Sequence, residues 1–567
     1  MTSHLDSGLA DLEAAKGKYG SGCAAEVEKL LASMRKCEFA DAESLIRLHD
    51  TLLFLRAFPQ SRKVVQLSEE LLADIGRQVR RLHQSGVDTE LFDSEEFSGI
   101  AGTAIEDTLT YEVARWLASR YPRDIRVAWD LDEQSRQMSS SLPQFLPLLG
   151  DDCFVEADTP YLEWLSCAAG GENHILPWLL QRLESAPLTI LQKTAWYDAL
   201  QIEISWELGD SSASRTRARR NPPSTYYHKS PLIVRKQVSL QQELDSPPLP
   251  VRKLSRRQGA DVLDFVREAL TVRYRELYGT TRGGPNHVIE ANAGRGVHIF
   301  LWGLPPDRRL PLRAYHSGLT VKNGVPINYI EGISLGEWME VGFNTFYAFR
   351  EGETAWIYAK VLHLLHQVTN VTCFSVYPYQ LGEGNEEAIK SGAFWFYRKL
   401  GFRPGKPELL AVTEREEAKI ATTPGYRTPA RTLRKLAAEH VFYEFGDQPR
   451  GLWDNFSTRN IGFAVQRHMA RKFKGDPEKM RQDTTASLAR ILQVDPKKWS
   501  APEQSAFSDF AAVLALVPDL ARWTNAEKQM VTQTIRAKVS PDEANYLRLL
   551  QRHRKLKEAI LSLGSKG

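Results

Sequence analysis

Residues 314–349 read AYHSGLTVKNGVPINYIEGISLGEWMEVGFNTFYAF, and this stretch decides the fold of the central part of the chain. Asn323 and Gly324 separate two apolar runs, one from Leu312, just before this stretch, to Val321 and the other from Val325 to Ile333. Asn-Gly between apolar runs is the strongest short-range signal for a β-hairpin, because both residues tolerate the positive φ angles of the tight turn. We therefore predict a pair of antiparallel strands here.

The segments on either side of the hairpin extend this layer. Val288 to Leu301 is rich in β-branched and aromatic residues, and Trp338 to Phe349 alternates apolar with polar or small residues, as a half-buried strand does. The apolar period then becomes helical over Glu353 to Val368 and over Glu386 to Leu400, with a strand-like run, Val371 to Tyr377, between them. This order of elements predicts a mixed α/β layer.

Outside this layer the pattern is helical. Before residue 210 the apolar residues recur with helical spacing, for example over Ala40 to Leu55 and Val64 to Leu82, and from about Arg431 the helical pattern returns. The predicted fold is multidomain, with an N-terminal all-α helical array, a central α/β domain with a mixed sheet and a C-terminal helical region. The predicted domains are residues 1–210 (helical), 211–257 (a Pro/Arg-rich, extended and solvated linker), 258–445 (α/β) and 446–567 (helical).

Length and composition are those of a large globular protein. At about 150 residues per domain, 567 residues predict three or four domains. The hydrophobic fraction of 42% and the charged fraction of 25% exclude wholesale disorder. The net charge of +3 argues against a surface devoted to nucleic acid. The basic tracts Arg215–Arg220 and Arg252–Arg257 are local exceptions, which we interpret as parts of a solvated linker.

The cysteines and the apolar runs indicate in which cellular compartment the protein is expected. The five cysteines are Cys23, Cys37, Cys153, Cys167 and Cys373. Their odd number and the lack of zinc-type spacing argue against a disulfide framework and against a metal site. The N-terminal residues lack the apolar core of a signal peptide, and the best apolar run, Phe510 to Val517, is too short to cross a bilayer. We expect a cytoplasmic protein with no metal and no membrane partner.

The segment Ala393 to Phe402 points to a particular protein family more specifically than the order of elements does. It reads AFWFYRKLGF and matches the A-x-x-x-Y-x-K-L-G-F ending of a helix in the GNAT superfamily of N-acetyltransferases. The hairpin, the strand from Trp338 and the helix from Glu353 follow in the order found in that superfamily. The match covers about residues 287–412, roughly a fifth of the chain. The central domain thus resembles a GNAT-like acyltransferase fold.

The resemblance implies a site for an acyl-CoA. In this superfamily, backbone N–H groups at the start of a helix hold the cofactor pyrophosphate, using unpaired donors and the helix dipole. The positions that match this loop and its surroundings are Arg350, Gly352, Thr354, Ala355 and Lys390.

The resemblance also implies candidates for proton transfer. A tyrosine on the last helix protonates the leaving thiolate, and Tyr397 occupies the matching position. A carboxylate takes a proton from the acceptor amine, and Glu340 and Glu331 on the predicted strands are candidates for that base.

The loop Arg350-Glu351-Gly352-Glu353-Thr354-Ala355 departs from the superfamily pattern R/Q-x-x-G-x-G/A, because Glu353 replaces the middle glycine. A carboxylate beside a pyrophosphate is repulsive. Two alternatives therefore remain open. One is a catalytically silent scaffold whose helical arrays bind protein partners. The other is a transferase that uses aminoacyl-tRNA as donor and needs no pyrophosphate loop.

The leading prediction is an N-acyltransferase-like protein that transfers an acyl group from acetyl-CoA, or another acyl-CoA, to an amine. The acceptor would be an amine-bearing small molecule or a protein. We expect no nucleic-acid partner except tRNA under the alternative stated above.

Overall fold

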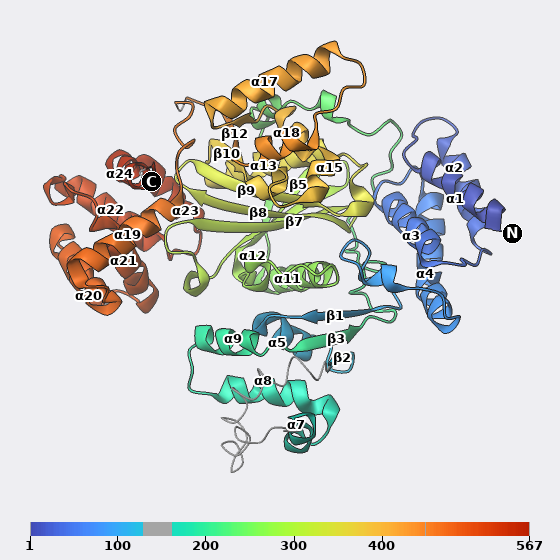
Figure 1. Cartoon of the computed structure of the whole chain (residues 1–567), viewed down its shortest axis with the longest axis horizontal. Helices are drawn as coiled ribbons and strands as arrows, with labels where there is room; N and C mark the ends of the chain where they lie inside the picture. Colours follow the sequence, from blue (N-terminus) through green and yellow to red (C-terminus); the bar gives the residue numbers. More distant parts are fainter. Residues whose placement is uncertain (1, 129–160, 448, 566–567) are drawn as a thin grey trace. The chain divides into compact units, whose positions relative to one another are not determined.

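The computed structural model describes residues 2–128, 161–447 and 449–565, so Cys153 lies outside the described residues (Figure 1). The chain divides into two compact units. Unit 1 comprises Met1–Pro231, Leu263–Arg282 and Asn323–Pro326, and unit 2 comprises Leu232–Val262, Gly283–Lys322 and Ile327–Gly567. Within the described ranges, no helix combines the length and the apolar composition needed to cross a bilayer.

Unit 1 is mainly helical. Among the described residues of this unit, the helices are α1 (Thr2–Lys16), α2 (Cys23–Met34), α3 (Ala42–Ala57), α4 (Arg62–Gln84), α5 (Tyr111–Arg120), α7 (Tyr161–Ala169), α8 (Ile175–Ser185), α9 (Ile190–Ala199) and α12 (Tyr278–Thr281). Helix α11 (Arg256–Thr271) spans the boundary between the two units. The N-caps Asp41 and Ser61 accept backbone N–H groups of α3 and α4, which fixes where these two helices begin.

Unit 1 also contains a small sheet, so the prediction of an all-α N-terminal region is wrong at this point. Strands β1 (Ala104–Thr108), β2 (Ile125–Val127) and β3 (Glu203–Glu207) pair antiparallel in the order β1-β3-β2. The strands are short, and the central strand β3 is buried at three consecutive positions. A strand covered on both faces shows no alternation of apolar and polar residues, which is why the sequence did not reveal it.

The basic tract Arg215–Arg220 is not a solvated linker either. Arg215 is only 2% exposed, and its guanidinium donates to the backbone oxygen of Glu96 at 2.8 Å. Arg219 pairs with Glu69 at 2.7 Å. The arginines hold this segment against other parts of unit 1 through backbone carbonyls and carboxylates, contacts that a composition-based prediction of a linker does not capture.

Unit 2 is built on a mixed sheet, as predicted. Among its described residues the strands are β4 (Val251–Lys253), β5 (Val288–Gly294), β6 (Val297–Gly303), β7 (Ala314–Lys322), β8 (Val325–Leu335), β9 (Trp338–Thr345), β10 (Cys373–Val376), β11 (Arg403–Pro404) and β12 (Val441–Glu444). Their order across the sheet is β11-β12-β10-β9-β8-β7-β6-β5-β4. The β9–β10 pair is parallel, whereas β10–β12, β11–β12, β4–β5, β5–β6, β6–β7 and β8–β9 are antiparallel. Figure 1 shows β7, β8 and β9 side by side.

The predicted hairpin is confirmed as β7 and β8. Asn323 and Gly324 have φ angles of 49° and 83°, the positive values that a two-residue hairpin turn requires. A second turn, at Gly294-Arg295-Gly296, joins β5 to β6, and its three φ angles are also positive. The two turns make β5–β6 and β7–β8 tight hairpins, and β6 and β7 pair antiparallel across the longer connection between Gly303 and Ala314.

The parallel pair β9–β10 is short. Its register joins Trp338 to Cys373, Met339 to Phe374 and Glu340 to Ser375, and ends there. Strand β9 continues to Thr345 while paired to β8 alone. The β9–β10 pairing therefore ends at Glu340, and β10 itself ends one residue after its last pair, at Val376.

The two helices predicted after β9 are present, but the second is interrupted. Helix α13 (Thr354–Thr369) covers one face of the sheet, where Tyr358 packs on Phe343 of β9 at a ring distance of 4.8 Å. The predicted helix from Glu386 to Leu400 is divided into α15 (Glu386–Ser391) and α16 (Ala393–Arg398). Gly392 between them has φ 68°, a left-handed conformation that ends the first helix.

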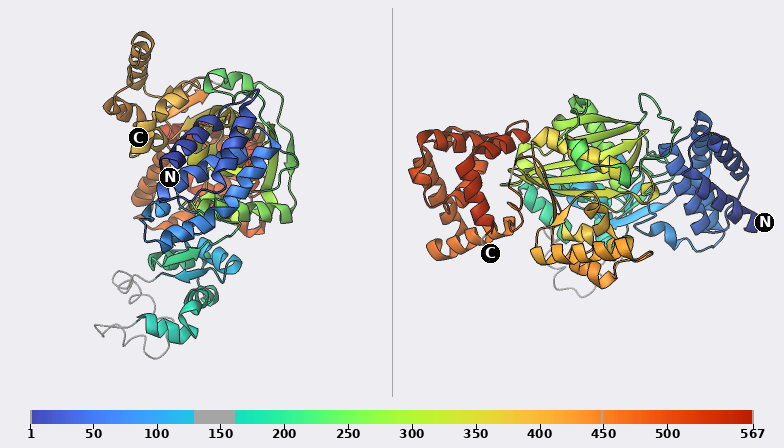
Figure 2. Two further views of the ribbon diagram at one scale, coloured as in Figure 1. Left: turned by 90° about the vertical axis from the view of Figure 1, so that its right-hand side faces the viewer. Right: turned by 90° about the horizontal axis from the view of Figure 1, so that it is seen from above.

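The remaining helices of unit 2 follow around the sheet and after it. They are α10 (Leu240–Leu244), α14 (Pro378–Leu381), α17 (Pro407–Thr422), α18 (Ala430–Ala437), α19 (Thr458–Phe473), α20 (Pro477–Leu492), α21 (Ala501–Leu514), α22 (Asn525–Ala537), α23 (Ala544–Arg552) and α24 (Arg554–Ser565). Figure 2 shows α19 to α24, in orange and red, gathered in one group beside the strands. A C-terminal helical region was predicted and is confirmed.

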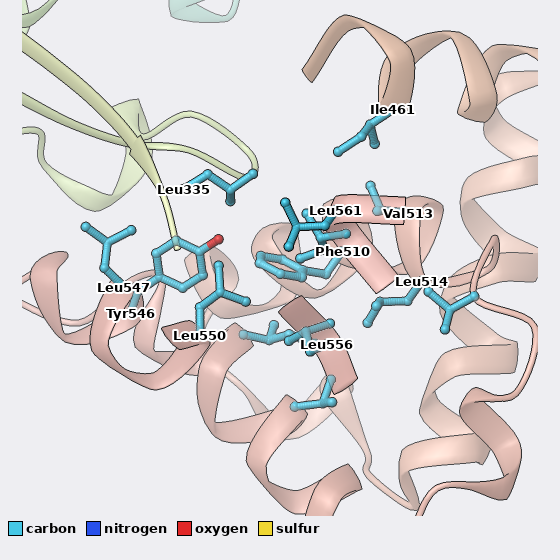
Figure 3. Packing of buried hydrophobic residues seen from close by; sticks show 14 of the residues in the cluster. Leu335, Ile461, Phe510, Val513, Leu514, Tyr546, Leu547, Leu550, Leu556 and Leu561 are labelled. Carbon is cyan, nitrogen blue, oxygen red and sulfur yellow. The ribbon is translucent and has the colours of Figure 1, made fainter. Parts of the chain in front are cut away.

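The C-terminal helices share a core with one end of the sheet. Phe510, Tyr546 and Leu556 pack together, and Leu335 of β8 belongs to the same cluster (Figure 3). The buried hydroxyl of Tyr546 donates to the backbone oxygen of Leu312 at 2.5 Å. The helical region is thus fixed to the sheet by apolar burial and by at least this one buried hydrogen bond.

Candidate active site

A cavity of about 920 Å³ opens at the N-terminus of α13. It is bordered by the segment Ile233–Arg235, by the start of α13, by α15 and α16, and by residues in and around α17 and α18. The five residues predicted to hold a cofactor all line it: Arg350, Gly352, Thr354, Ala355 and Lys390. The structure thus brings together residues that lie up to 40 positions apart in the chain.

The helix end at this cavity presents unpaired donors. The first intrahelical bond of α13 runs from the N–H of Ile357 to the oxygen of Glu353 at 2.9 Å. The N–H groups of Thr354, Ala355 and Trp356 precede it and have no acceptor within the helix. The side chain of Glu353 makes no capping bond to them. This end of the helix carries a partial positive charge and favours an anion.

The side chains around the cavity are mainly cationic. The basic lining residues are Arg235, Arg350, Lys390, Lys399 and Arg427, and the acidic one is Glu386. Glu386 is paired with Arg434 at 2.9 Å. Burial, followed by the charge of Arg235, lowers the pKa of Lys399. In the part of the chain that the structure describes, no carboxylate pairs with Lys390, Lys399 or Arg427.

Apolar side chains form the rest of the lining. Trp395, Phe396 and Ile389 come from α15 and α16, and Leu433 comes from α18. The indole N–H of Trp395 donates to the hydroxyl of Thr428 at 3.1 Å, which fixes the ring at the wall. A mixed lining of cations and aromatic or aliphatic groups suits a ligand that is anionic at one end and apolar at the other.

Arg350 is held at the rim of the cavity. Its guanidinium forms an ion pair with Glu387 and lies over the ring of Tyr347, with the carbon Cζ 3.9 Å from the ring centroid. The Tyr347 hydroxyl donates to the same carboxylate at 2.9 Å. Arg350 is therefore positioned by two partners, and its charge is shared with Glu387.

Glu353, the residue that departs from the GNAT-like loop pattern, does not line the cavity. Its carboxylate is fully buried, pairs with Arg295 at 2.5 Å and with Lys322 at 3.5 Å, and accepts the N–H of Ile233 at 3.1 Å. Burial lowers the pKa of Lys322 to about 7, against the opposing effect of Glu353. The carboxylate thus joins the β5–β6 turn, β7 and the segment at Ile233, and its charge is compensated locally.

Tyr397 lies beside the cavity and is not part of its lining. It is 5% exposed, packs edge-on against Tyr358 at 5.8 Å, and donates its hydroxyl to Oε1 of Gln380 at 3.2 Å. The Gln380 amide in turn lies 3.0 Å from the place where a Cβ atom on Gly342 would be. The hydroxyl is thus linked through Gln380 to β9 at a point beyond the end of the β9–β10 pairing. Burial raises the pKa of Tyr397.

Glu331 and Glu340 lie on one face of the sheet. Glu331 of β8 is directly opposite Gly342 of β9, and Glu340 is two residues away on the same strand. Glu331 accepts the hydroxyl of Tyr315, and burial raises the pKa of Glu331 despite that bond. Glu340 bonds Nε2 of His440 at 2.9 Å. The structure therefore places both carboxylates near Gly342, where Gln380 also lies.

Other reactive side chains are engaged elsewhere. His363 bonds Glu243 at 3.1 Å, and His366 bonds the oxygen of Val371 at 2.8 Å. Burial raises the pKa of the Cys373 thiol, which is 4% exposed. The described residues contain no group of three or more side chains suited to hold a metal ion.

Several residues of the site were not found from the sequence. Gln380 and Glu387 lie within the GNAT-like segment but match no part of the pattern used there. Lys399 is the lysine of that pattern, but the pattern assigned it no role in the site. Arg235 and Arg427 come from segments that flank it at a distance. No spacing in the sequence links them, because they meet through the folding of separate loops onto the start of α13.

Comparison of the chain with known proteins gives no support for or against this assignment. The chain matches no protein-family model, no curated protein and no solved structure.

Proposed function

We propose that unit 2 is an N-acyltransferase that uses an acyl-CoA as donor and an amine as acceptor. The observation that carries the proposal is the cavity at the N-terminus of α13, because it gathers Arg350, Gly352, Thr354, Ala355 and Lys390 around unpaired N–H groups. These are the residues that the GNAT-like resemblance implies for the cofactor.

The lining fits such a donor at its phosphate end. The unpaired N–H groups of Thr354 and Ala355, together with Lys390 and Arg427, can hold phosphate oxygens. The volume of 920 Å³ is in the upper part of the range for small-molecule sites. Glu353 is compensated by Arg295 and Lys322, so the repulsion expected from the sequence is reduced.

An acyl-CoA supplies an acyl group that is already activated as a thioester. In this proposal Glu331 or Glu340 accepts the proton of the attacking amine, and Tyr397 gives a proton to the leaving thiolate. The raised pKa of Tyr397 keeps its hydroxyl protonated at neutral pH, as an acid must be. Tyr397 and Gly342 both lie against Gln380, and Glu331 is opposite Gly342, so the groups proposed to transfer protons lie near one another, outside the cavity lining.

Isothermal titration of the full chain with acetyl-CoA and with longer acyl-CoAs tests the proposal. Lys390→Ala and Arg427→Ala are each expected to weaken binding by about tenfold or more, the usual effect of losing one charged hydrogen bond to a phosphate. The matched control is Lys497→Ala, which changes an exposed lysine outside the cavity. No heat of binding with any acyl-CoA, or equal affinities for all three variants, would refute it.

The burial of Tyr397 favours a second candidate, a catalytically silent scaffold. A tyrosine that is 5% exposed and bonded to Gln380 can serve packing alone. On that hypothesis acyl-CoA binding is absent and protein partners are sought on the helical regions. The third hypothesis, a transferase that uses aminoacyl-tRNA, can be distinguished from these two, because it alone requires that the protein retain tRNA at moderate salt.

A further inference from the structure

A second cavity of about 380 Å³ lies in unit 2 and shares no lining residue with the candidate active site. Its walls come from β4, β5, β6 and β7, from Val368 in the last turn of α13, and from the loop Pro541–Glu543 before α23. Its volume equals that of about a dozen water molecules at ~30 Å³ each. This is enough for one small organic molecule.

The sheet provides a mostly apolar floor. Ile289 is opposite Leu301, and Lys253 is opposite Ile289, so the three side chains lie on one face of the sheet. Gly303, opposite His316, lies on the same face two residues beyond Leu301. A Cβ atom at Gly303 would meet nothing closer than a backbone oxygen at 3.9 Å. The missing side chain at Gly303 therefore leaves space beside His316.

His316 is the polar group that this floor presents. It is 5% exposed, and its Nδ1 atom is buried without a hydrogen-bond partner among the described residues. Burial lowers the pKa of His316, so the imidazole is neutral near pH 7. A neutral imidazole offers one donor and one acceptor, and leaving such a group unpaired in the interior is costly.

Three of the four charged groups at the cavity are paired within the protein. Arg309 donates to the backbone oxygens of Leu304 at 3.0 Å and Ser540 at 2.7 Å. Glu543 pairs with the buried Lys538. Asp542, the second carboxylate of the lining, pairs with Arg548 at 3.0 Å. With two cations and two carboxylates in the lining, the site has no excess charge that would select an ion.

We infer that this cavity binds a small uncharged molecule, aromatic or alicyclic, whose hydroxyl group hydrogen-bonds the imidazole of His316. The apolar floor would contact the ring of the ligand, and the open space at Gly303 would hold that ring beside His316. The imidazole of His316 would bond the hydroxyl group. Such a site is independent of the acyl-CoA cavity, and it lies at the opposite end of α13.

The test compares phenol with toluene, which have nearly the same shape and differ in one hydroxyl group. The hydroxyl both donates and accepts, so it suits either tautomer of His316. Both probes are titrated against the full chain by saturation-transfer NMR. In His316→Leu the ratio of the two affinities should shift toward toluene by about tenfold, the effect of losing one partner for a buried polar group.

Gly303→Val is the second variant, because its side chain fills the open space without requiring an unusual φ angle. It should abolish the binding of both probes and leave acyl-CoA binding unchanged, whereas Lys390→Ala should leave probe binding unchanged. The inference is overturned if neither probe binds the wild type, as when only water occupies the cavity. It is also overturned if Gly303→Val still binds the probes, or if the affinity ratio in His316→Leu equals that of the wild type.

Discussion

The buried pair of Lys322 and Glu353 yields a quantitative prediction about the structure that supports the cavity. Both side chains are fully buried, and Lys322 also donates to the backbone oxygen of Arg295. Burial lowers the pKa of Lys322 from 10.5 to about 7, a change worth about 5 kcal/mol of free energy between the two protonation states. We propose the substitution Lys322→Met, which keeps the length of the side chain and removes the titrating group.

The sign follows from proton linkage. Between about pH 7 and about pH 10.5 the unfolded chain holds a proton on Lys322 and the folded chain does not. The free energy of unfolding of the wild type therefore rises with pH in this window, by about 1.4 kcal/mol per pH unit from this group alone. Lys322→Met lacks this contribution. The stability of the variant relative to the wild type should fall by about 3 kcal/mol between about pH 8 and about pH 10.

Guanidinium unfolding of both proteins at several pH values, followed by tryptophan fluorescence, measures this difference. A loss of packing or of the bond to Arg295 changes the variant by a constant amount and leaves the slope unaffected. Lys497→Met, at an exposed lysine, is the control and should differ from the wild type by an amount independent of pH. If the wild type and Lys322→Met give parallel stability curves, Lys322 keeps its proton in the folded chain over this pH range and the lowered pKa of Lys322 is wrong.

Three further predictions concern the site and its frame. Tyr397→Phe should lower the rate of acyl transfer by about 10²-fold or more, the range for an acid–base group, while the midpoint of thermal unfolding stays close to that of the wild type. An unchanged turnover rate in steady-state kinetics would show that Tyr397 serves packing alone. If Glu331 is the base, turnover should rise as the pH rises through the raised pKa of Glu331, because only the carboxylate accepts a proton. Glu331→Gln should remove this rise from the pH–rate profile, and an unaltered profile would exclude Glu331 as the base. Gly392→Ala should lower the free energy of unfolding by about 1 kcal/mol, because φ is 68°, with a smaller loss for Gly392→Asn; equal stabilities in denaturant titrations would contradict the left-handed turn between α15 and α16.

Local chemistry made much of the central layer predictable. Asn323-Gly324 specifies a turn with two positive φ angles whatever surrounds it, so the β7–β8 hairpin followed from a dipeptide and its apolar flanks. Helix α13 was visible in the same way, through apolar residues at helical spacing. The prediction was wrong where the local signal is weak, as in the short strands β1 to β3, and at Gly392, where one glycine divides a helix with a continuous apolar pattern.

The candidate site shows the limit of such predictions. The matching segment gave Arg350, Gly352, Thr354, Ala355 and Lys390, because they fall at positions that the superfamily uses for its cofactor, although Lys390 lies 40 residues after Arg350. It could not give Arg235 or Arg427, which come from distant segments, nor the partners of Glu353. From the sequence Glu353 appeared to oppose a phosphate. In the structure Arg295 and Lys322, from a turn and a strand dozens of residues earlier, compensate its charge. The sequence by itself determined where the turns and helices form, because propensity and period act between neighbours. Only the tertiary structure decided which charges are paired, where β9 leaves β10, and which side chains meet at a cavity, because those depend on contacts between residues far apart in the chain.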